Sequence, residues 1–231
     1  MMLLSISEQF YKSLIYDDRY KYILTGLGNT IIMAVCAVLI GALIGLIIAI
    51  IRTYHDNTNK MKVLNWLAKM YVTVIRGTPV LLQLMIIYYV IFASVNINVV
   101  LVGIVAFGLN SAAYVSEIIR AGIMSIDKGQ MEAGRALGLT YSETMKLIII
   151  PQALKNVMPA LGNEFITLLK ETSVAGYIGI VELTKAGDII ASRTYNYFFP
   201  LILTAIIYLI LTAGLSKILK KFERSNWSVR S

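Results

Sequence analysis

Three polar side chains in an apolar segment are the first candidates for chemistry in this 231-residue chain. Asn110, Tyr114 and Glu117 follow the spacing i, i+4 and i+7 within residues 99–124, so a helix would place them on one face. An ionisable group inside an apolar span is costly and usually faces a cavity or a partner. A carboxylate beside a phenol could bind a cation there. A structural ion pair between Glu117 and Arg120 is the alternative.

A second polar face occurs in residues 156–171. Asn163, Glu164 and Thr167 lie on one side of the helix that this segment predicts. Glu164 could bind a ligand or pair with Lys170 at the helix end. If both faces line one cavity, their two carboxylates favour a ligand that carries positive charge.

A third candidate is the stretch Arg76-Gly77-Thr78-Pro79. Proline prefers the first turn of a helix, so Pro79 predicts a new helix after a break, with Thr78 as its N-cap. The free amide groups of a helix that begins at membrane depth can receive an anion. A plain helix start at the membrane surface, with Arg76 reaching to water, is the alternative.

Catalytic and metal sites are not expected. His55 and Cys36 are the only histidine and cysteine, so neither a nucleophile–base pair nor a set of metal ligands can be assembled around them. The chain has no GxxxxGK[ST] loop and cannot hydrolyse ATP by that chemistry. We therefore expect no enzyme activity and no cofactor in this chain, and any energy must come from a partner or an ion gradient.

Composition predicts an all-α integral membrane protein with one transmembrane domain over residues 1–231. The chain is 58% hydrophobic, and its mean hydropathy is +0.73. The basic residues behind the net charge of +8 alternate with apolar segments, so a nucleic-acid partner is not expected. Apolar runs predict five membrane spans, at about residues 25–51, 63–92, 99–124, 156–171 and 199–219.

The distribution of basic residues predicts the orientation. Residues 52–76, 120–155 and 217–231 hold fifteen of the 21 Lys and Arg residues. The positive-inside rule places these three segments in the cytoplasm. Five spans with a cytoplasmic C-terminus put the N-terminus outside.

Small residues recur at every fourth position of the first span, at Ala37, Gly41, Gly45 and Ala49. Such a stripe allows another helix to approach closely. Packing within the chain and contact with a second subunit both remain open.

A polar helical hairpin is predicted over residues 128–151. Its first helix has no continuous apolar stripe and ends before Gly138, a residue that tolerates positive φ. Thr140 and Glu143 form a capping box for a second helix. The small residues of the first helix would let another protein approach its backbone, so the hairpin is typical of a docking element.

The hairpin resembles the EAA loop of ATP-binding-cassette (ABC) importer permeases. The resemblance rests on Glu132-Ala133-Gly134, Gly138, Ile148 and Pro151. The family usually has Ala where Gly134 stands and Leu where Ile150 stands. Residues 76–79, 113–130 and 170–173 resemble the subfamily that imports polar amino acids, and the similarity runs over residues 25–215.

This resemblance implies a type I importer permease fold in a prokaryotic inner membrane. It implies a dimer with a second permease subunit, two ATPase subunits that bind ATP and Mg, and an extracytoplasmic amino-acid-binding protein. Transport would proceed by alternating access. The two carboxylates favour a polar, basic amino acid. The expected ATPase-coupling residues are Glu132, Ala133, Gly134 and Gly138, and the expected substrate-binding residues are Thr78, Tyr114, Glu117, Asn163, Glu164 and Thr167.

A gradient-driven secondary amino-acid transporter is the alternative function. In that mechanism Glu117 or Glu164 would carry protons. It predicts inverted repeats, which the sequence does not show, and it does not need a docking hairpin.

Overall fold

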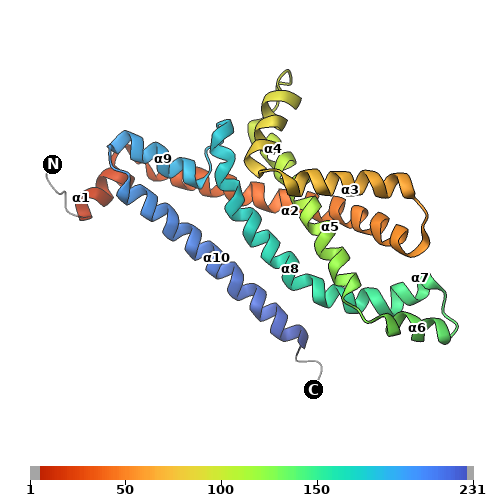
Figure 1. Cartoon of the computed structure of the whole chain (residues 1–231). Helices are drawn as coiled ribbons and strands as arrows, with labels where there is room; N and C mark the ends of the chain where they lie inside the picture. Colours follow the sequence, from red (N-terminus) through yellow and green to blue (C-terminus); the bar gives the residue numbers. More distant parts are fainter. Residues whose placement is uncertain (1–5, 228–231) are drawn as a thin grey trace. The chain divides into compact units, whose positions relative to one another are not determined.

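The computed structural model describes residues 6–227, with side chains described for residues 7–222 (Figure 1). All regular elements in this range are helical, which confirms the all-α prediction. The α-helices are α1 (Ile6–Phe10), α2 (Tyr20–Thr58), α3 (Lys62–Gly77), α4 (Val80–Ile86), α5 (Val99–Met124), α6 (Lys128–Ala136), α7 (Tyr141–Thr144), α8 (Ile150–Glu171), α9 (Leu183–Thr194) and α10 (Phe198–Trp227). The shorter 3₁₀ and π turns are η1 (Tyr11–Ile15), η2 (Tyr16–Asp18), η3 (Ile87–Ile91), η4 (Met145–Ile149) and η5 (Thr172–Ile178).

Three helices in the described part of the chain are long and apolar enough to cross a membrane: α2, α5 and α10. The pair formed by α3 and the segment 80–91 makes a fourth if it is counted as one broken span. The predicted span 156–171 falls in α8, which does not meet this test and carries four charged residues, Lys155, Glu164, Lys170 and Glu171. The five-span count therefore stays a prediction.

The predicted helix break occurs at residues 78–79. Thr78 has extended backbone (φ −125°, ψ 149°) as the C-cap of α3, and its hydroxyl donates to the carbonyl oxygen of Val74 at 2.8 Å. α4 then begins at Val80, one residue later than the predicted start at Pro79. Thr78 thus closes the helix before the break. Its predicted role as the N-cap of the next helix stays a prediction.

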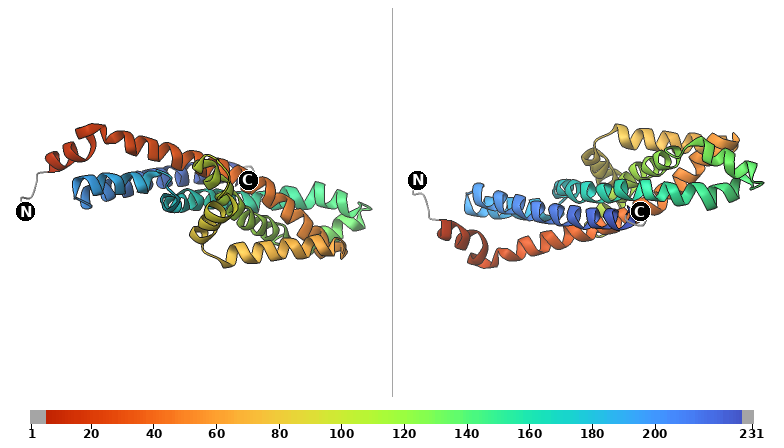
Figure 2. Two further views of the ribbon diagram at one scale, coloured as in Figure 1. Left: turned by 90° about the horizontal axis from the view of Figure 1, so that it is seen from above. Right: turned by 90° about the horizontal axis from the view of Figure 1, so that it is seen from below.

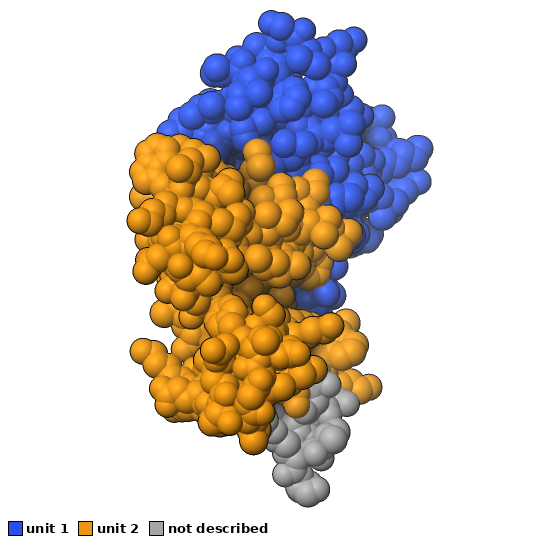
Figure 3. Space-filling model, turned by 90° about the vertical axis from the view of Figure 1, so that its right-hand side faces the viewer, with its two compact units in different colours: residues 1–37, 80–107, 166–216 blue, residues 38–79, 108–165, 217–231 orange. Residues whose placement is uncertain are grey.

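The chain forms two compact units, which Figure 3 colours separately. Unit 1 comprises residues 1–37, 80–107 and 166–216, and unit 2 comprises residues 38–79, 108–165 and 217–231. α2, α5, α8 and α10 each contribute residues to both units.

In unit 1, α9 lies beside the first turns of α2 (Figures 1 and 2). Ile23 of α2 packs with the buried face of α9, formed by Leu183, Ala186 and Ile190. The contact is close, because a Cβ atom added at Gly26 would lie 2.9 Å from the Cβ atom of Ala186. Apolar burial and a small residue on α2 therefore hold this helix pair together.

A buried carboxylate, Glu182, is the N-cap of α9. Its side chain is among the largest fully buried ones and accepts the backbone N–H groups of Thr184 (2.6 Å) and Lys185 (2.7 Å). The hydroxyl of Tyr208 on α10 donates to the same carboxylate at 3.3 Å. The backbone N–H of Leu183 donates to the hydroxyl of Thr30 on α2 at 3.1 Å. These bonds connect the start of α9 to two long helices.

The burial of Glu182 predicts a pH-dependent stability. Burial raises the pKa of this carboxyl above its usual 4.5, and the hydrogen bonds from Thr184, Lys185 and Tyr208 only partly oppose the rise. Between 4.5 and the raised pKa the folded state binds the proton more strongly than the unfolded state, so stability falls as pH rises through that window. We expect the melting temperature of wild type to fall as pH rises through this window and that of Glu182→Gln not to fall. A constant difference from wild type at every pH would contradict the prediction.

In unit 2, the second half of α2 packs on α3 and α5. Ile48, Ala68, Val72 and Ala113 form the buried cluster, and the hydroxyl of Tyr71 donates to the carbonyl oxygen of Leu109. The small residues of α2 face α5, since Cβ atoms added to Gly41 and Gly45 would lie 2.7 Å from the Ser111 hydroxyl oxygen and 2.8 Å from Val115 Cγ1. Packing within the chain therefore uses at least this part of the stripe.

We expect Gly45→Leu to reduce the amount of folded chain recovered from membranes. The larger side chain would overlap Val115 and the carbonyl oxygen of Ala112, and such overpacking costs about 1–3 kcal/mol or more. Gly28→Leu on the same helix is the control, because no described atom beyond its chain neighbours and its own helix backbone lies within 4 Å of a Cβ atom there. Gel filtration in detergent measures both variants, and equal recovery would rule out the packing role of Gly45.

Candidate functional site

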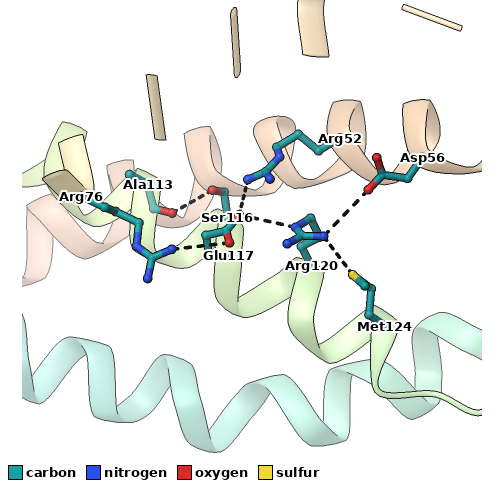
Figure 4. Close-up of polar contacts among 8 residues, drawn as sticks. All are labelled: Arg52, Asp56, Arg76, Ala113, Ser116, Glu117, Arg120 and Met124. Atoms are coloured by element: carbon teal, nitrogen blue, oxygen red, sulfur yellow. Dashed lines mark hydrogen bonds and ion pairs between the residues drawn. The ribbon is translucent and has the colours of Figure 1, made fainter. Parts of the chain in front are cut away.

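The polar face around Glu117 is an ion-pair cluster within unit 2 (Figure 4). Arg52 of α2 donates to one carboxylate oxygen of Glu117, and Arg76 of α3 approaches the other at 3.4 Å. The Nε atom of Arg120, one turn along α5, lies 3.4 Å from the carboxylate. Three helices of unit 2 thus place guanidinium groups around one carboxylate.

The cluster carries one net positive charge. Arg120 also lies 3.9 Å from Asp56, so three guanidinium groups face two carboxylates. Exposure differs sharply among its members: the side chain of Arg52 is 11% exposed and that of Arg76 is 45% exposed. Arg76 is therefore the cation that solvent or a ligand reaches most easily.

The structural alternative for Glu117, an ion pair with Arg120, is present, and two further arginines join it. Tyr114 is engaged as well, since the guanidinium carbon of Arg76 lies 5.5 Å from the centre of its ring. The sequence offers Tyr114 as a partner for a ligand cation. One face of its ring already makes a cation–π contact with Arg76 of the chain itself.

Glu164 lies partly buried on α8 and accepts a hydrogen bond from the Ser111 hydroxyl at 3.3 Å. This bond joins the polar faces of α5 and α8 within unit 2. Asn163 is exposed beside it. Thr167 is exposed one turn further along α8, in the part of the helix that belongs to unit 1. Its place in a binding site stays a prediction from spacing.

The predicted hairpin is confirmed as a local structure. Asp127 caps α6 by accepting the N–H of Gly129 at 2.7 Å. α6 ends at Ala136, and Gly138 (φ +86°) follows its C-cap, Leu137. The N–H of Gly138 donates to the Arg135 carbonyl and that of Leu139 to the Gly134 carbonyl, the two bonds of a Schellman motif. The capping box of Thr140 and Glu143 is complete, and its hydrogen bonds hold the pKa of Glu143 below the usual value.

The coupling candidates on the hairpin divide into two kinds. Glu132 and Ala133 are exposed. Gly134 is buried, because α6 packs on the following helix: a Cβ atom added there would lie 2.5 Å from Thr144 Cγ2 and 3.1 Å from Ile148 Cδ1. The expectation that Gly134 admits an external protein is therefore corrected, since this glycine admits the side chain of Thr144 from within the hairpin.

The comparisons with known proteins identify the family. Residues 41–226 match the family described as the binding-protein-dependent transport system inner membrane component. The chain belongs to this family. The fold agrees: a solved structure named as an amino acid ABC transporter with histidines is 43% identical, with a TM-score of 0.85, over 97% of this chain and 100% of that one.

Two curated relatives of this permease family show how far the similarity extends. The arginine transport system permease protein of Bacillus subtilis is 42% identical over 208 residues, 89% of this chain and 93% of its own length. A protein provisionally named as a glutamine transport system permease in Rickettsia prowazekii is 42% identical over 211 residues, 90% of this chain and 94% of its own length. These matches support an ABC importer permease and not a gradient-driven secondary transporter.

Sequence reasoning missed several charged groups of this permease. It did not connect Arg52 with Glu117 or Asp56 with Arg120, although both residues lie in the last two turns of α2. It also overlooked Glu182, which stands directly before α9 as an N-cap carboxylate would. Its position before a helical run was the available signal.

Proposed function

We propose that this chain is the membrane subunit of an ATP-driven importer for a polar amino acid. It would pair with a second permease copy or a paralogue, with two ATPase subunits and with an extracytoplasmic binding protein. The full-length match to a solved amino acid ABC transporter at 43% identity carries this proposal. The names of the relatives, which specify glutamine and arginine, support the substrate class.

We propose a substrate site in unit 2 between a group of positive charge around Arg76 and the carboxylate of Glu164. Arg76 and the net positive charge of the Glu117 cluster would receive the substrate carboxylate. Glu164 would receive its ammonium group, with Asn163 beside it and with Thr78 and Tyr114 near Arg76 in sequence or space. The carboxylate and the ammonium group of the amino acid then each have a partner of opposite charge in the site. This avoids the free-energy cost of burying an unpaired charge.

This assignment changes the argument for a basic substrate. The sequence-based preference rested on two carboxylates, and Glu117 is already bound by arginines of the chain. Glu164 alone can serve the ammonium group that every amino acid carries. We therefore propose that the site accepts a neutral side chain such as that of glutamine as well as a basic one.

The hairpin is the proposed contact with the ATPase. Glu132 and Ala133 would meet that partner directly, because both are exposed. Gly134 and Gly138 would act by shaping the hairpin, through close packing and a left-handed turn. ATP-driven movement of the ATPases would then reach α5 and α8, which flank the hairpin, and change access to the site.

Calorimetry on the purified permease–ATPase complex tests the substrate site. Glu164→Gln keeps the shape of the side chain but removes its charge, so we expect the dissociation constants of glutamine and arginine to rise by about tenfold or more. Glu171→Gln, on the same helix, is the control and should bind as wild type does. Unchanged affinity in Glu164→Gln would show that the amino acid binds elsewhere.

Cysteine labelling tests the orientation. In a Cys36→Ala background, a cysteine replacing the exposed Ala136 should react with an impermeant maleimide only after the cells are opened. A cysteine replacing the exposed Ser192 should react in intact cells. The reverse pattern would place the hairpin outside and exclude its contact with a cytoplasmic ATPase.

A further inference from the structure

A cavity of about 420 Å³ lies in unit 2 beneath the hairpin. Its walls are the last turns of α2, the last turns of α5 and the hairpin elements α6 and η4. Three of its lining residues, Asp56, Arg120 and Met124, appear in Figure 4. The volume falls within the range of about 300–1,000 Å³ that small-molecule sites occupy.

Thr53 marks this cavity as a place for a polar ligand. Thr53 is one of the lining residues and is only 8% exposed, and its hydroxyl oxygen is covered by neighbouring atoms without a hydrogen-bond partner among the described residues. A buried hydroxyl without a partner is unfavourable. A ligand group that displaces the covering atoms and reaches this oxygen would supply the missing hydrogen bond.

The charges around the cavity restrict the ligand. Asp56, Asp127 and Glu132 contribute carboxylates, and Arg120 and Lys128 contribute cations. The carboxylates would repel a phosphate or a nucleotide, and the cations would repel a polyamine. An apolar ligand would leave Thr53 without a partner. A small zwitterion fits both signs of charge.

The ion pair between Arg120 and Asp56 offers the anchoring point. At 3.9 Å it is the longer of the two contacts that Arg120 makes with carboxylates in the described part of the chain. A ligand carboxylate could bind Arg120 while the ligand ammonium binds Asp56, so each residue exchanges one partner of opposite charge for another. Three methionines of the wall, Met124, Met131 and Met145, can adapt to different side chains.

We propose that the cavity is a second amino-acid site, filled from the cytoplasm, that inhibits the transporter when its product accumulates. This proposal rests on the proposed function for the orientation and the substrate class. A ligand in the cavity contacts the span helices α2 and α5 on one side and the hairpin on the other. It would hold the hairpin in one position, and a ligand that favours one state shifts the population toward it.

Thr53→Val tests the site by calorimetry with L-glutamine and L-arginine on the purified permease–ATPase complex. Valine keeps the shape of threonine and removes only the hydroxyl. We expect two classes of site in wild type, one weakened by Glu164→Gln and the other weakened about tenfold by Thr53→Val. Thr58→Val is the matched control on the same helix, because the Thr58 hydroxyl donates to the Tyr54 carbonyl and does not line the cavity.

The outcomes separate this site from the proposed function. If Thr53→Val weakens only the second class of binding site and Thr58→Val binds as wild type does, the cavity site is supported. This holds even if Glu164→Gln has no effect and the proposed substrate site fails. Identical binding by Thr53→Val and wild type overturns it. In liposomes with the ATPase outward, amino acid added outside should inhibit ATP hydrolysis in wild type and require about tenfold more in Thr53→Val. Equal inhibition of the two would also overturn it.

Discussion

Glu117→Gln is expected to lower the free energy of unfolding of the chain by roughly 3 kcal/mol. The substitution removes the one charge that neutralises Arg52, whose side chain is only 11% exposed, and it loosens Arg76 and Arg120 as well. An uncompensated guanidinium group in a largely buried place is costly. Denaturation of the purified chain in mixed micelles measures the loss.

Two further variants show whether this loss comes from the ion cluster. Asp56→Asn breaks only the 3.9 Å contact of a carboxylate that is 43% exposed, and we expect a change within about 1 kcal/mol. Arg52→Gln combined with Glu117→Gln removes the unpaired cation and should recover part of the stability. If Glu117→Gln were as stable as wild type but failed to bind amino acids, Glu117 would be a substrate ligand and the cluster would not be structural.

The second large effect is expected at Gly134, where alanine should weaken or abolish association with the ATPase. The added methyl group would lie 2.5 Å from Thr144 Cγ2 and 2.9 Å from its hydroxyl oxygen, so α6 must move away from the following helix. Overpacking of this kind costs about 1–3 kcal/mol and displaces the exposed Glu132 and Ala133. Co-purification of the ATPase with the permease measures the loss.

A second substitution, Thr144→Ala, distinguishes two roles of Gly134: packing within the hairpin and direct contact with the ATPase. Thr144→Ala removes the two nearest atoms that the new methyl group would meet and leaves only Ile148 Cδ1, at 3.1 Å, the end of a flexible side chain. Gly134→Ala with Thr144→Ala should therefore recover the ATPase contact. The permeases that this hairpin resembles usually have alanine at the position of Gly134, which agrees with a site that accepts alanine when its neighbour is small. Failure of the double variant to recover would mean that the ATPase itself needs the glycine.

Patterns between near neighbours in the sequence determined several local features of the fold. The Asp127 cap was not predicted, but Gly138 and the capping box of Thr140 and Glu143 were, because each depends on residues within one or two turns. The break near Pro79 and the positions of α2, α5 and α10 followed from the same kind of local information, namely proline geometry and the length of apolar runs. Composition alone was enough for the all-α class.

Other features depended on packing between distant segments, and the sequence could not specify them. Arg52 and Arg76 stand 65 and 41 residues before Glu117, and nothing in their spacing indicates that α2 and α3 direct both guanidinium groups to one carboxylate. The sequence offered Gly134 as a surface residue, and only the packing of α6 on Thr144 turned it inward. The cavity at Thr53 has the same origin, because it exists only where the ends of α2 and α5 meet the hairpin.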